Sequence, residues 1–374
     1  MLDVLKLSQD LIAIPSASQI SNRAIGDYLE DLLSQDFELE RLSYFDDRFI
    51  VDGKAVEKVS LVAKRGQGSG GIAFFSHTDT VPGAEDAWQP YEGMVQDGKL
   101  YGRGSCDMKG PLAATLLAAQ QMSIRDLKKP VYLILTADEE MGFLGAKQVV
   151  GESQLLSLWP DMGVIAEPTC LRPVYAHKGG HHIIVTAHGL AAHTSTDQGI
   201  SANFLIAPFL AEMAEMAKIF KTDSSFMNPE FSPPTNGFNM TLSDGNCAAN
   251  VTAAKTICTL NFRDMPQSRS QDIIEMISRK AQNYGFEVEA RGFEAFYTDP
   301  QSEIIKLSLL ATGTDKAIAV PYGTEALIYQ DHLPLVILGP GDIAQAHTVG
   351  EWIELRQLTE AQHIYQSMIR QYCC

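Results

Sequence analysis

Apolar runs of strand type recur along the first half of the chain and once near its end. They are residues 71–76 (GIAFFS), 131–136 (VYLILT), 162–166 (MGVIA) and 335–338 (LVIL). Continuous apolar strands are typical of a sheet that is covered on both faces. A helical pattern at 111–122 (PLAATLLAAQQM) lies between the first two runs, and its proline suits a first helical turn. This alternation predicts an α/β domain.

The alternation of polar and apolar positions changes character between residues 179 and 292. We expect a strand at 181–188, a helix at 201–220, strands at 237–242 and 256–262, a helix at 271–284 and a strand at 286–290. Pro208 falls inside the first helix, which would kink it or delay its start. The order βαββαβ is the ferredoxin-like arrangement. We therefore predict a discontinuous catalytic domain of residues 1–178 and 293–374 and an inserted ferredoxin-like domain of residues 179–292.

The composition narrows the class of protein. A chain of 374 residues is long for a single core, and its 45% of hydrophobic residues is typical of a globular protein. The excess of 46 Asp and Glu over 29 Lys and Arg residues gives a net charge of −17. A surface this acidic repels phosphate backbones and anionic lipids, so we expect neither a nucleic-acid nor a membrane partner.

The N-terminus and the cysteines indicate the compartment. Residues 1–18 contain no basic segment followed by a long apolar stretch, so we expect an amphipathic helix there and neither signal peptide nor transmembrane segment. The six cysteines are scattered without a CxxC pair, which fits reduced thiols in the cytoplasm. We expect Cys373 and Cys374 to form a frayed tail.

Metal-binding side chains cluster in five short segments, most of them directly after a predicted strand. The segments are SHTD with His77 and Asp79, CDMKG with Asp107, DEE at 138–140, AEPT with Glu167, and AHT with His347. In open α/β sheets ligands bind beyond the carboxyl ends of the strands, so we expect these segments to meet at one edge. Two imidazoles and three carboxylates as ligands, with one carboxylate left over as a base, indicate a two-metal hydrolase.

The residue types suit different tasks within such a site. In His77-x-Asp79 the carboxylate is placed to orient the imidazole. Glu139 and Glu140 are neighbours whose side chains diverge, so that one is able to bind a metal while the other faces the attacking water. Asp107, in a loop rich in small residues, is the candidate bridging carboxylate. We expect two divalent ions, with zinc favoured and cobalt or manganese as substitutes.

Motifs along nearly the whole chain resemble the M20 family of dinuclear zinc amidohydrolases and peptidases. They are SHTDTVPG, DGKLYGRGSCDMKG, TADEEMGFLGA, AEPT, AHKG, AAHTSTDQGISA, LNFRDMP, LGPG and AHTVGEWIE. Glu167 followed by Pro168 is typical of the branch that contains acetylornithine deacetylase and succinyl-diaminopimelate desuccinylase. The resemblance implies a zinc-peptidase-like mixed sheet flanked by helices.

The resemblance also implies a role for each residue of the metal site. Two overlapping sets would hold the metals: His77, Asp107 and Glu167 the first ion, and Asp107, Glu140 and His347 the second. Asp79 would orient His77, and Glu139 would be the general base.

Three residues of the inserted segment match substrate-contacting positions of the family. His193 matches a histidine that stabilises the transition state, often across a dimer interface. Arg263, in FRDMP, matches an arginine that binds the substrate carboxylate, and Asn250 matches an asparagine near the substrate. Asn250 is followed by VTAAK, without the proline often found nearby, and Gly350 stands where a polar residue is more usual.

The implied activity is metal-dependent hydrolysis of an N-acyl amino acid to a carboxylate and a free amino acid. N-acetylornithine, and with it arginine biosynthesis, is the first substrate to consider. A dipeptidase, an aminopeptidase or a desuccinylase with the same metal centre is the alternative within enzymes. A catalytically silent binding protein is the alternative from another class, which the complete set of ligands and base disfavours. Family analogy further implies a homodimer.

Overall fold

The structure is a computed structural model that describes residues 2–374. The chain divides into two compact units, in which the second is inserted into the first. Unit 1 comprises Met1–Tyr175, Thr298–Ile318 and Thr324–Cys374, and unit 2 comprises Ala176–Tyr297 and Ala319–Gly323.

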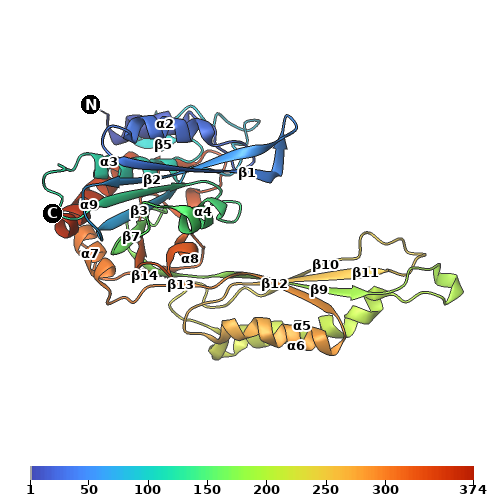
Figure 1. Ribbon diagram of the computed structural model, residues 1–374. Coiled ribbons are helices and arrows are strands. Elements are labelled where there is room, and N and C mark those ends of the chain that lie inside the picture. Colours follow the sequence, from blue (N-terminus) through green and yellow to red (C-terminus); the bar gives the residue numbers. More distant parts are fainter. Residues whose placement is uncertain (1) are drawn as a thin grey trace. The chain divides into compact units, whose positions relative to one another are not determined.

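Unit 1 is built on a mixed sheet in the order β1-β2-β6-β3-β7-β15 that continues to the first residue of β8 (Figure 1). Its strands are β1 (Glu38–Val51), β2 (Lys54–Arg65), β3 (Ile72–His77), β6 (Val131–Thr136), β7 (Met162–Ile165), β15 (Leu335–Ile337) and β8 (Val174–His177). The central strands β6, β3, β7 and β15 run parallel to one another, and the β1–β2 hairpin joins β6 antiparallel. The central strands β3, β6, β7 and β15 are buried throughout, as a sheet with helices on both faces requires.

The strand register aligns the ends of the parallel strands. His77, the last residue of β3, is paired with Thr136, the last residue of β6. One strand further, Phe75 is paired with Ile165, the last residue of β7, which in turn is paired with Ile337 at the end of β15. The loops that leave these strands therefore start at one edge of the sheet.

Helices pack on this sheet in separate groups. They are α1 (Val4–Ile12), α2 (Arg23–Leu33), α3 (Lys109–Gln120), α4 (Leu144–Glu152), α7 (Glu303–Thr312), α8 (Ala326–Tyr329) and α9 (Leu355–Cys373). The apolar helix α3 is almost entirely buried, because it contacts β3 and β6 on one side and α1 and α9 on others. Helix α4 packs against α8, β2 and β6. A small antiparallel sheet of β16 (Trp352–Glu354), β5 (Lys99–Tyr101) and β4 (Met94–Gln96) completes unit 1.

Unit 2 has the order of a ferredoxin-like domain. Its elements are β9 (Gly180–His188), α5 (Ala202–Thr222), β10 (Asn239–Ser243), β11 (Lys255–Phe262), α6 (Ile273–Asn283) and β12 (Glu287–Phe293). The sheet is antiparallel in the order β10-β11-β9-β12. Two residues of β13 (Phe296–Tyr297) pair with the last residues of β8. Further short elements are β14 (Ile318–Val320) and the 3₁₀ turns Thr194–Thr196, Ser224–Phe226, Arg269–Asp272 and Ile343–Gln345, of which the last lies in unit 1.

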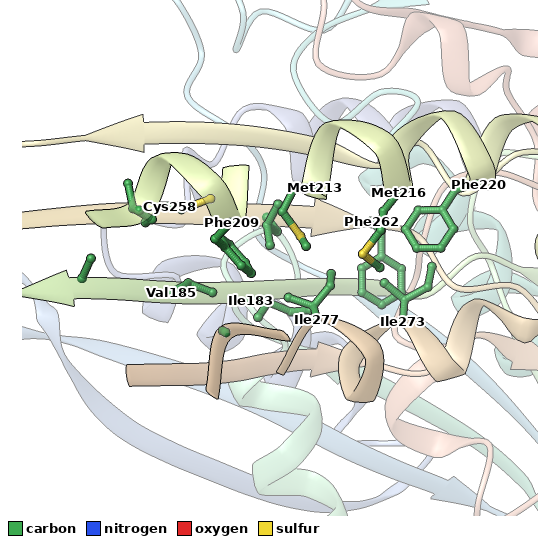
Figure 2. Close-up of a cluster of buried hydrophobic side chains, with 14 of the residues drawn as sticks. Ile183, Val185, Phe209, Met213, Met216, Phe220, Cys258, Phe262, Ile273 and Ile277 are labelled. Carbon is green, nitrogen blue, oxygen red and sulfur yellow. The ribbon is translucent and has the colours of Figure 1, made fainter. Parts of the chain in front are cut away.

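The core of unit 2 lies between one face of the sheet and its two long helices (Figure 2). Phe209 and Met213 of α5 and Ile277 of α6 point toward Ile183 and Val185 of β9, and all five are at most 1% exposed. Strand β11 alternates between buried and partly exposed positions, as expected where only one face of a sheet is covered.

Two expectations from the sequence are corrected. Helix α5 begins at Ala202 despite Pro208, because its buried stripe, which includes Ile206 and Phe209, outweighs one missing hydrogen bond. The chain end is not frayed at Cys373: α9 includes this residue, its side chain is 1% exposed, and its carbonyl accepts hydrogen bonds from the amides of Lys128 (2.7 Å) and Lys129 (3.2 Å). All six cysteines are free thiols in residues 2–374, and no helix in that range is long and apolar enough to cross a membrane.

Burial along α5 predicts unequal effects of the same substitution. Ile206→Ala removes a side chain that is 1% exposed, and it should destabilise unit 2 by about 2–5 kcal/mol through lost burial and a residual cavity. Ile219→Ala, the matched control on the same helix, changes a side chain that is 47% exposed and should cost less than about 1 kcal/mol. Native-state hydrogen exchange of the β9 and β11 amides measures both values. Equal effects of the two variants would contradict this assignment of the core.

Candidate metal centre

The loops at the aligned strand ends carry the predicted ligands. His77 closes β3, Glu139 and Glu140 follow β6, and Glu167 follows β7. His347 lies in the segment after β15, while Asp107 precedes α3; both belong to unit 1, as do the others. The structure thus gathers side chains that are up to 270 positions apart (His77 to His347, 347 − 77) in one place.

Two groups of three ligands share Asp107. Ligand atoms lie within 4.8 Å of one another in the set His77, Asp107 and Glu167 and in the set Asp107, Glu140 and His347. Asp107 Oδ1 lies 3.0 Å from His77 Nε2, whereas its Oδ2 lies 3.3 Å from His347 Nε2. His77 Nε2 is 3.4 Å from Glu167 Oε1, and His347 Nε2 is 2.9 Å from Glu140 Oε1. A carboxylate with one oxygen toward each group is the arrangement of a bridging ligand.

The donor set fits two divalent cations. Each group offers one imidazole nitrogen and carboxylate oxygens, which are ligand types that zinc accepts. The Nε2 atoms of both imidazoles face carboxylate oxygens. In the metal-free protein a proton is shared across each contact, and a bound cation would replace that proton. Burial tends to lower the pKa of His77, but its hydrogen bond to Asp107 and the nearby carboxylates of Asp79 and Glu167 hold that pKa well above its ordinary value. Hydrogen bonds to Asp107 and Glu140 raise the pKa of His347 to about 10.

Asp79 acts on this site mainly through the turn after β6. The Nδ1 atom of His77 lies 3.0 Å from the backbone carbonyl oxygen of Asp79 and 3.6 Å from its carboxylate. The carboxylate instead accepts hydrogen bonds from the amides of Glu139 (3.1 Å) and Glu140 (3.3 Å) and from the hydroxyl of Ser18 (2.7 Å). Asp79 therefore orients the imidazole with its backbone and fixes the Glu139–Glu140 turn with its side chain.

Glu139 and Glu140 differ in their contacts. Glu140 belongs to the set with Asp107 and His347, whereas Glu139 is grouped only with His77 and Glu140. Within residues 2–374 the Glu139 carboxylate makes no hydrogen bond of its own. Burial, followed by the charges of nearby carboxylates such as Glu167, raises the pKa of Glu139 well above its ordinary value despite the opposing charge of His77. This favours Glu140 as a ligand and leaves Glu139 as the more basic carboxylate beside the ligands.

Glu351 supports the site but has no assigned role in the sequence analysis. Its side chain is fully buried, and Oε1 accepts hydrogen bonds from the amides of Cys106 (2.9 Å) and Asp107 (3.0 Å). Oε2 accepts from the guanidinium of Arg103 (2.7 Å) and the amide of Gly104 (3.2 Å). Glu351 thus holds the loop that presents Asp107. The motif AHTVGEWIE contains this residue, but its partners lie 244 to 248 positions away, which no local pattern reveals.

The remaining predicted residues belong to unit 2. His193 and Asn250 are neighbours there, because His193 bridges to Val251 and the amide of Thr194 donates to the Asn250 carbonyl (3.0 Å). The Nδ1 atom of the exposed His193 imidazole accepts from the amide of Ser195 (3.2 Å) and lies 2.7 Å from the hydroxyl oxygen of Ser195, which leaves Nε2 as the nitrogen that carries a proton. Arg263 follows β11, and its guanidinium is exposed and lies beside Gly180 of β9.

Known proteins resemble the chain over most of its length. Residues 73–371 match the family described as Peptidase family M20/M25/M40. An acetylornithine deacetylase from Pasteurella multocida is 30% identical, with 99% of this chain and 98% of that protein covered.

Solved structures share the fold at lower identity. A tripeptidase from Staphylococcus aureus has a TM-score of 0.72 at 20% identity, covering 98% of this chain and 97% of that one. The Bacillus subtilis protein YXEP, described as a dinuclear metal-binding peptidase, has a TM-score of 0.67 at 16% identity and covers 98% and 97% of the two chains. These structures confirm the predicted fold class.

The protonation of the ligands predicts a pH-dependent metal affinity. His347, with a pKa of about 10, is protonated at neutral pH in the metal-free protein, and burial raises the pKa of Glu167 to about 7. Both groups must lose their proton to bind a cation, so Zn²⁺ affinity should fall as the pH falls from 9 to 6, by about tenfold per pH unit for each displaced proton. Calorimetry in buffers of different ionisation enthalpy counts these protons. His347→Asn should release about one proton fewer at pH 8, and a pH-independent affinity would contradict this reading.

Because Glu351 holds the loop that presents Asp107, we expect its substitution to weaken metal binding. Glu351→Gln replaces one acceptor oxygen by an amide, so two hydrogen bonds of the 103–107 loop are lost. Zn²⁺ affinity should fall about 10- to 100-fold, as for other residues that hold a ligand in place. Glu354→Gln, on the neighbouring strand β16, is the control and should leave the affinity within about twofold. The comparison fails if both variants bind Zn²⁺ like the unaltered protein in a competitive titration.

Proposed function

The chain belongs to the peptidase M20 family of hydrolases, and on that premise we propose that it is a metal-dependent deacylase of N-acyl amino acids. The first substrate to test is N-acetylornithine, because the acetylornithine deacetylase from Pasteurella multocida is similar to this chain from end to end. The products would be acetate and a free amino acid, and the pathway would be arginine biosynthesis.

The main support for this proposal is one observation. Two groups of candidate ligands share Asp107, and the Glu139 carboxylate lies next to them without a hydrogen-bond partner in residues 2–374. His77, Asp107 and Glu167 would hold one ion, and Asp107, Glu140 and His347 the other. When bound, two divalent cations, zinc in our proposal, would polarise the amide carbonyl and make a nearby water more acidic. A neighbour described as a dinuclear metal-binding peptidase supports the count of two.

Glu139 is suited to move the proton. A carboxylate with a raised pKa is a stronger base than one in water, and after accepting a proton from the attacking water it is a suitable acid. In the proposed reaction Glu139 takes the proton of the water as the C–O bond forms. It then delivers that proton to the leaving amine nitrogen as the C–N bond breaks, and the next water restores the cycle.

Three residues of unit 2 complete the proposal. His193, with its Nε2 available, would donate to the oxyanion that develops on the amide carbonyl. The exposed guanidinium of Arg263 would bind the substrate carboxylate in bidentate fashion, and Asn250 would contact the same substrate. These assignments rest on the family resemblance and on the chemistry of the side chains.

We also propose a homodimer and a cytoplasmic location. Strand β10 is an edge strand of unit 2, and Leu242 on it is 53% exposed, while Phe204 at the start of α5 is 83% exposed. Exposed apolar side chains beside an unpaired sheet edge are suited to pairing with a second copy of the chain. The free cysteines fit a reducing compartment.

A substrate screen of the zinc-loaded protein tests the proposal. N-acetyl-L-ornithine should be hydrolysed, whereas N-succinyl-diaminopimelate and unblocked dipeptides should react more slowly; faster hydrolysis of a dipeptide would support the peptidase alternative. Glu139→Gln should lower kcat about 10²- to 10⁴-fold while metal content stays unchanged, because the proton carrier alone is lost. Full activity in that variant would refute the role of Glu139. Bound metal without hydrolysis of any amide would support a silent binding protein.

A further inference from the structure

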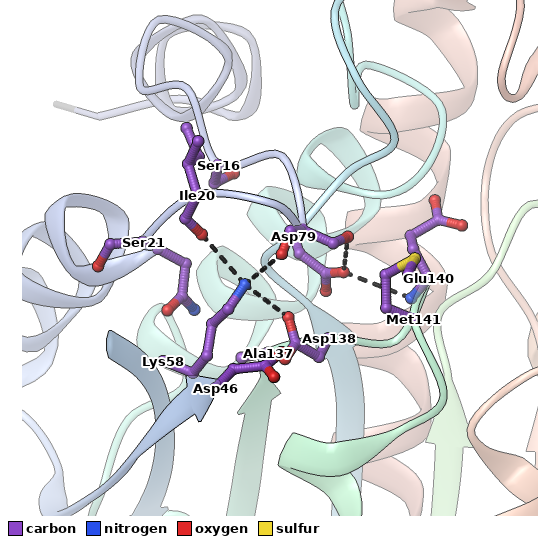
Figure 3. Close-up of polar contacts among 12 residues, drawn as sticks. Ser16, Ile20, Ser21, Asp46, Lys58, Asp79, Ala137, Asp138, Glu140 and Met141 are labelled. Atoms are coloured by element: carbon purple, nitrogen blue, oxygen red, sulfur yellow. Dashed lines mark hydrogen bonds and ion pairs between the residues drawn. The ribbon is translucent and has the colours of Figure 1, made fainter. Parts of the chain in front are cut away.

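A buried lysine stands behind the turn that carries Glu139 and Glu140. Lys58, on β2, is fully buried, and its ammonium nitrogen lies 2.7 Å from Asp138 Oδ1 (Figure 3). The same nitrogen donates hydrogen bonds to the carbonyl oxygens of Ser18 (2.5 Å) and Ile20 (3.0 Å). The Lys58 ammonium group therefore makes two hydrogen bonds to backbone carbonyls and one ion pair with a buried carboxylate.

The two segments that Lys58 joins both contact Asp79. From one side the Ser18 hydroxyl donates to Asp79 Oδ2 at 2.7 Å. From the other side the amides of Glu139 and Glu140 donate to the two oxygens of Asp79. Lys58, the 18–20 segment, Asp79 and the 138–140 turn therefore form a closed ring of polar contacts, most of which are visible in Figure 3.

Strand β1 holds the same turn from its other end. Tyr44 donates its hydroxyl proton to Asp138 Oδ2 at 2.7 Å. Arg48 pairs with the buried Asp46 at 2.7 Å and donates to the carbonyl oxygen of Met141 at 2.7 Å. Asp138 itself has a φ of +59°, in the left-handed region, so its side-chain contacts fix a backbone shape that few residues adopt readily.

A buried ion pair of this kind contributes little to stability by itself. The cost of removing both charges from water is about as large as their attraction, and apolar residues of similar volume often stabilise a fold as well or better. What the contacts of Lys58 add is direction, because its ammonium group reaches the two carbonyl oxygens and the Asp138 carboxylate together only in one arrangement of the 18–20 segment and the 138–140 turn.

We propose that Lys58 is a positioning residue: through Asp138 it holds the Glu139–Glu140 turn against Asp79, which keeps the Glu139 carboxylate beside the metal ligands. The statement about Glu139 rests on the proposed function, whereas the statement about the turn does not. Neither Lys58 nor Asp138 touches the ligand groups directly in residues 2–374, so the effect is transmitted by the backbone of the turn.

The decisive variant removes both charges. Lys58→Met alone leaves the Asp138 carboxylate in the interior with only the Tyr44 hydroxyl and the more distant Arg48 guanidinium (3.4 Å) as partners, which endangers folding. Lys58→Met combined with Asp138→Asn avoids that, and asparagine tolerates the left-handed backbone and still accepts the Tyr44 hydroxyl. We expect a thermal midpoint close to that of the unaltered protein. We also expect exchange of the Glu139 and Glu140 amides to be about tenfold faster or more in metal-free protein.

Kinetics provide the second readout. With N-acetyl-L-ornithine, the double variant should lose about 10- to 100-fold in kcat, with KM within about threefold, because Glu139 is displaced rather than the substrate. Lys64→Met, on the same strand with its ammonium group bonded to the Gly68 carbonyl, is the control and should change neither value. If Lys58 served only the stability of the fold, the double variant would have both the thermal midpoint and the kcat of the unaltered protein. That result would overturn the proposal.

The proposal remains testable if the double variant does not fold or if the proposed function is wrong. If the double variant does not fold, Tyr44→Phe tests the same turn from β1 without changing a buried charge, and it should speed exchange of the two amides several-fold. Unchanged exchange in Tyr44→Phe would then overturn the proposal. If the unaltered protein hydrolyses no N-acyl amino acid, the proposed function fails, but amide exchange in the metal-free double variant still decides whether Lys58 holds the turn.

Discussion

Repulsion among carboxylates is the constraint on which the site depends. Asp107, Glu139, Glu140 and Glu167 lie at one edge of a sheet together with the imidazoles of His77 and His347. Burial, with like charges adding to it, raises the pKa of Glu139, Glu140 and Glu167, and hydrogen bonds to carboxylates raise the pKa of His77 and His347. In the metal-free protein these groups therefore bind protons more readily than they would in water. Two divalent cations would replace those protons with charge that the ligands share, and Glu139, which belongs to neither shared group, would keep its own.

Backbone amides allow such an acidic cluster to keep its shape. The two residues that hold its loops, Asp79 and Glu351, are themselves buried carboxylates that accept hydrogen bonds from main-chain N–H groups. Each converts a flexible loop into a fixed one: Asp79 the turn after β6, and Glu351 the loop before α3. Because a carboxylate accepts several N–H bonds at once, one side chain is enough to orient each loop. The parallel strands set where these loops begin, and the two carboxylates set where they go.

The sequence predicts the parts of this arrangement that have a local signal. Four apolar runs locate β3, β6, β7 and β15 to within about a residue, and the metal-binding segments that follow them are brought together in unit 1. The βαββαβ order of unit 2 is equally visible in its periodicity, and the family resemblance is confirmed. Local patterns do not show which distant atoms meet. Glu351 reaches residues more than 240 positions away, and Lys58 joins segments 38 to 80 positions from it (138 − 58 = 80). The sequence predicts a frayed end at Cys373 because the last two residues carry no local sign of how α9 packs, whereas the structure buries the Cys373 side chain.

Asp79 shows why single-residue roles read from a motif are incomplete. The pattern His77-x-Asp79 suggests a carboxylate that orients an imidazole, yet the nearer partner of Nδ1 is the Asp79 carbonyl oxygen. The carboxylate is engaged by Ser18 and by the amides of Glu139 and Glu140. One residue therefore orients the His77 imidazole and also fixes the position of Glu139. Because the two tasks use different atoms of Asp79, its side chain is left to hold the Glu139–Glu140 turn, which Tyr44, Arg48 and Lys58 also contact. A further path runs from Asp79 through Ser18 to Lys58 and returns through Asp138 to the same turn, so His77 and the Glu139–Glu140 turn are held by one continuous set of buried polar contacts.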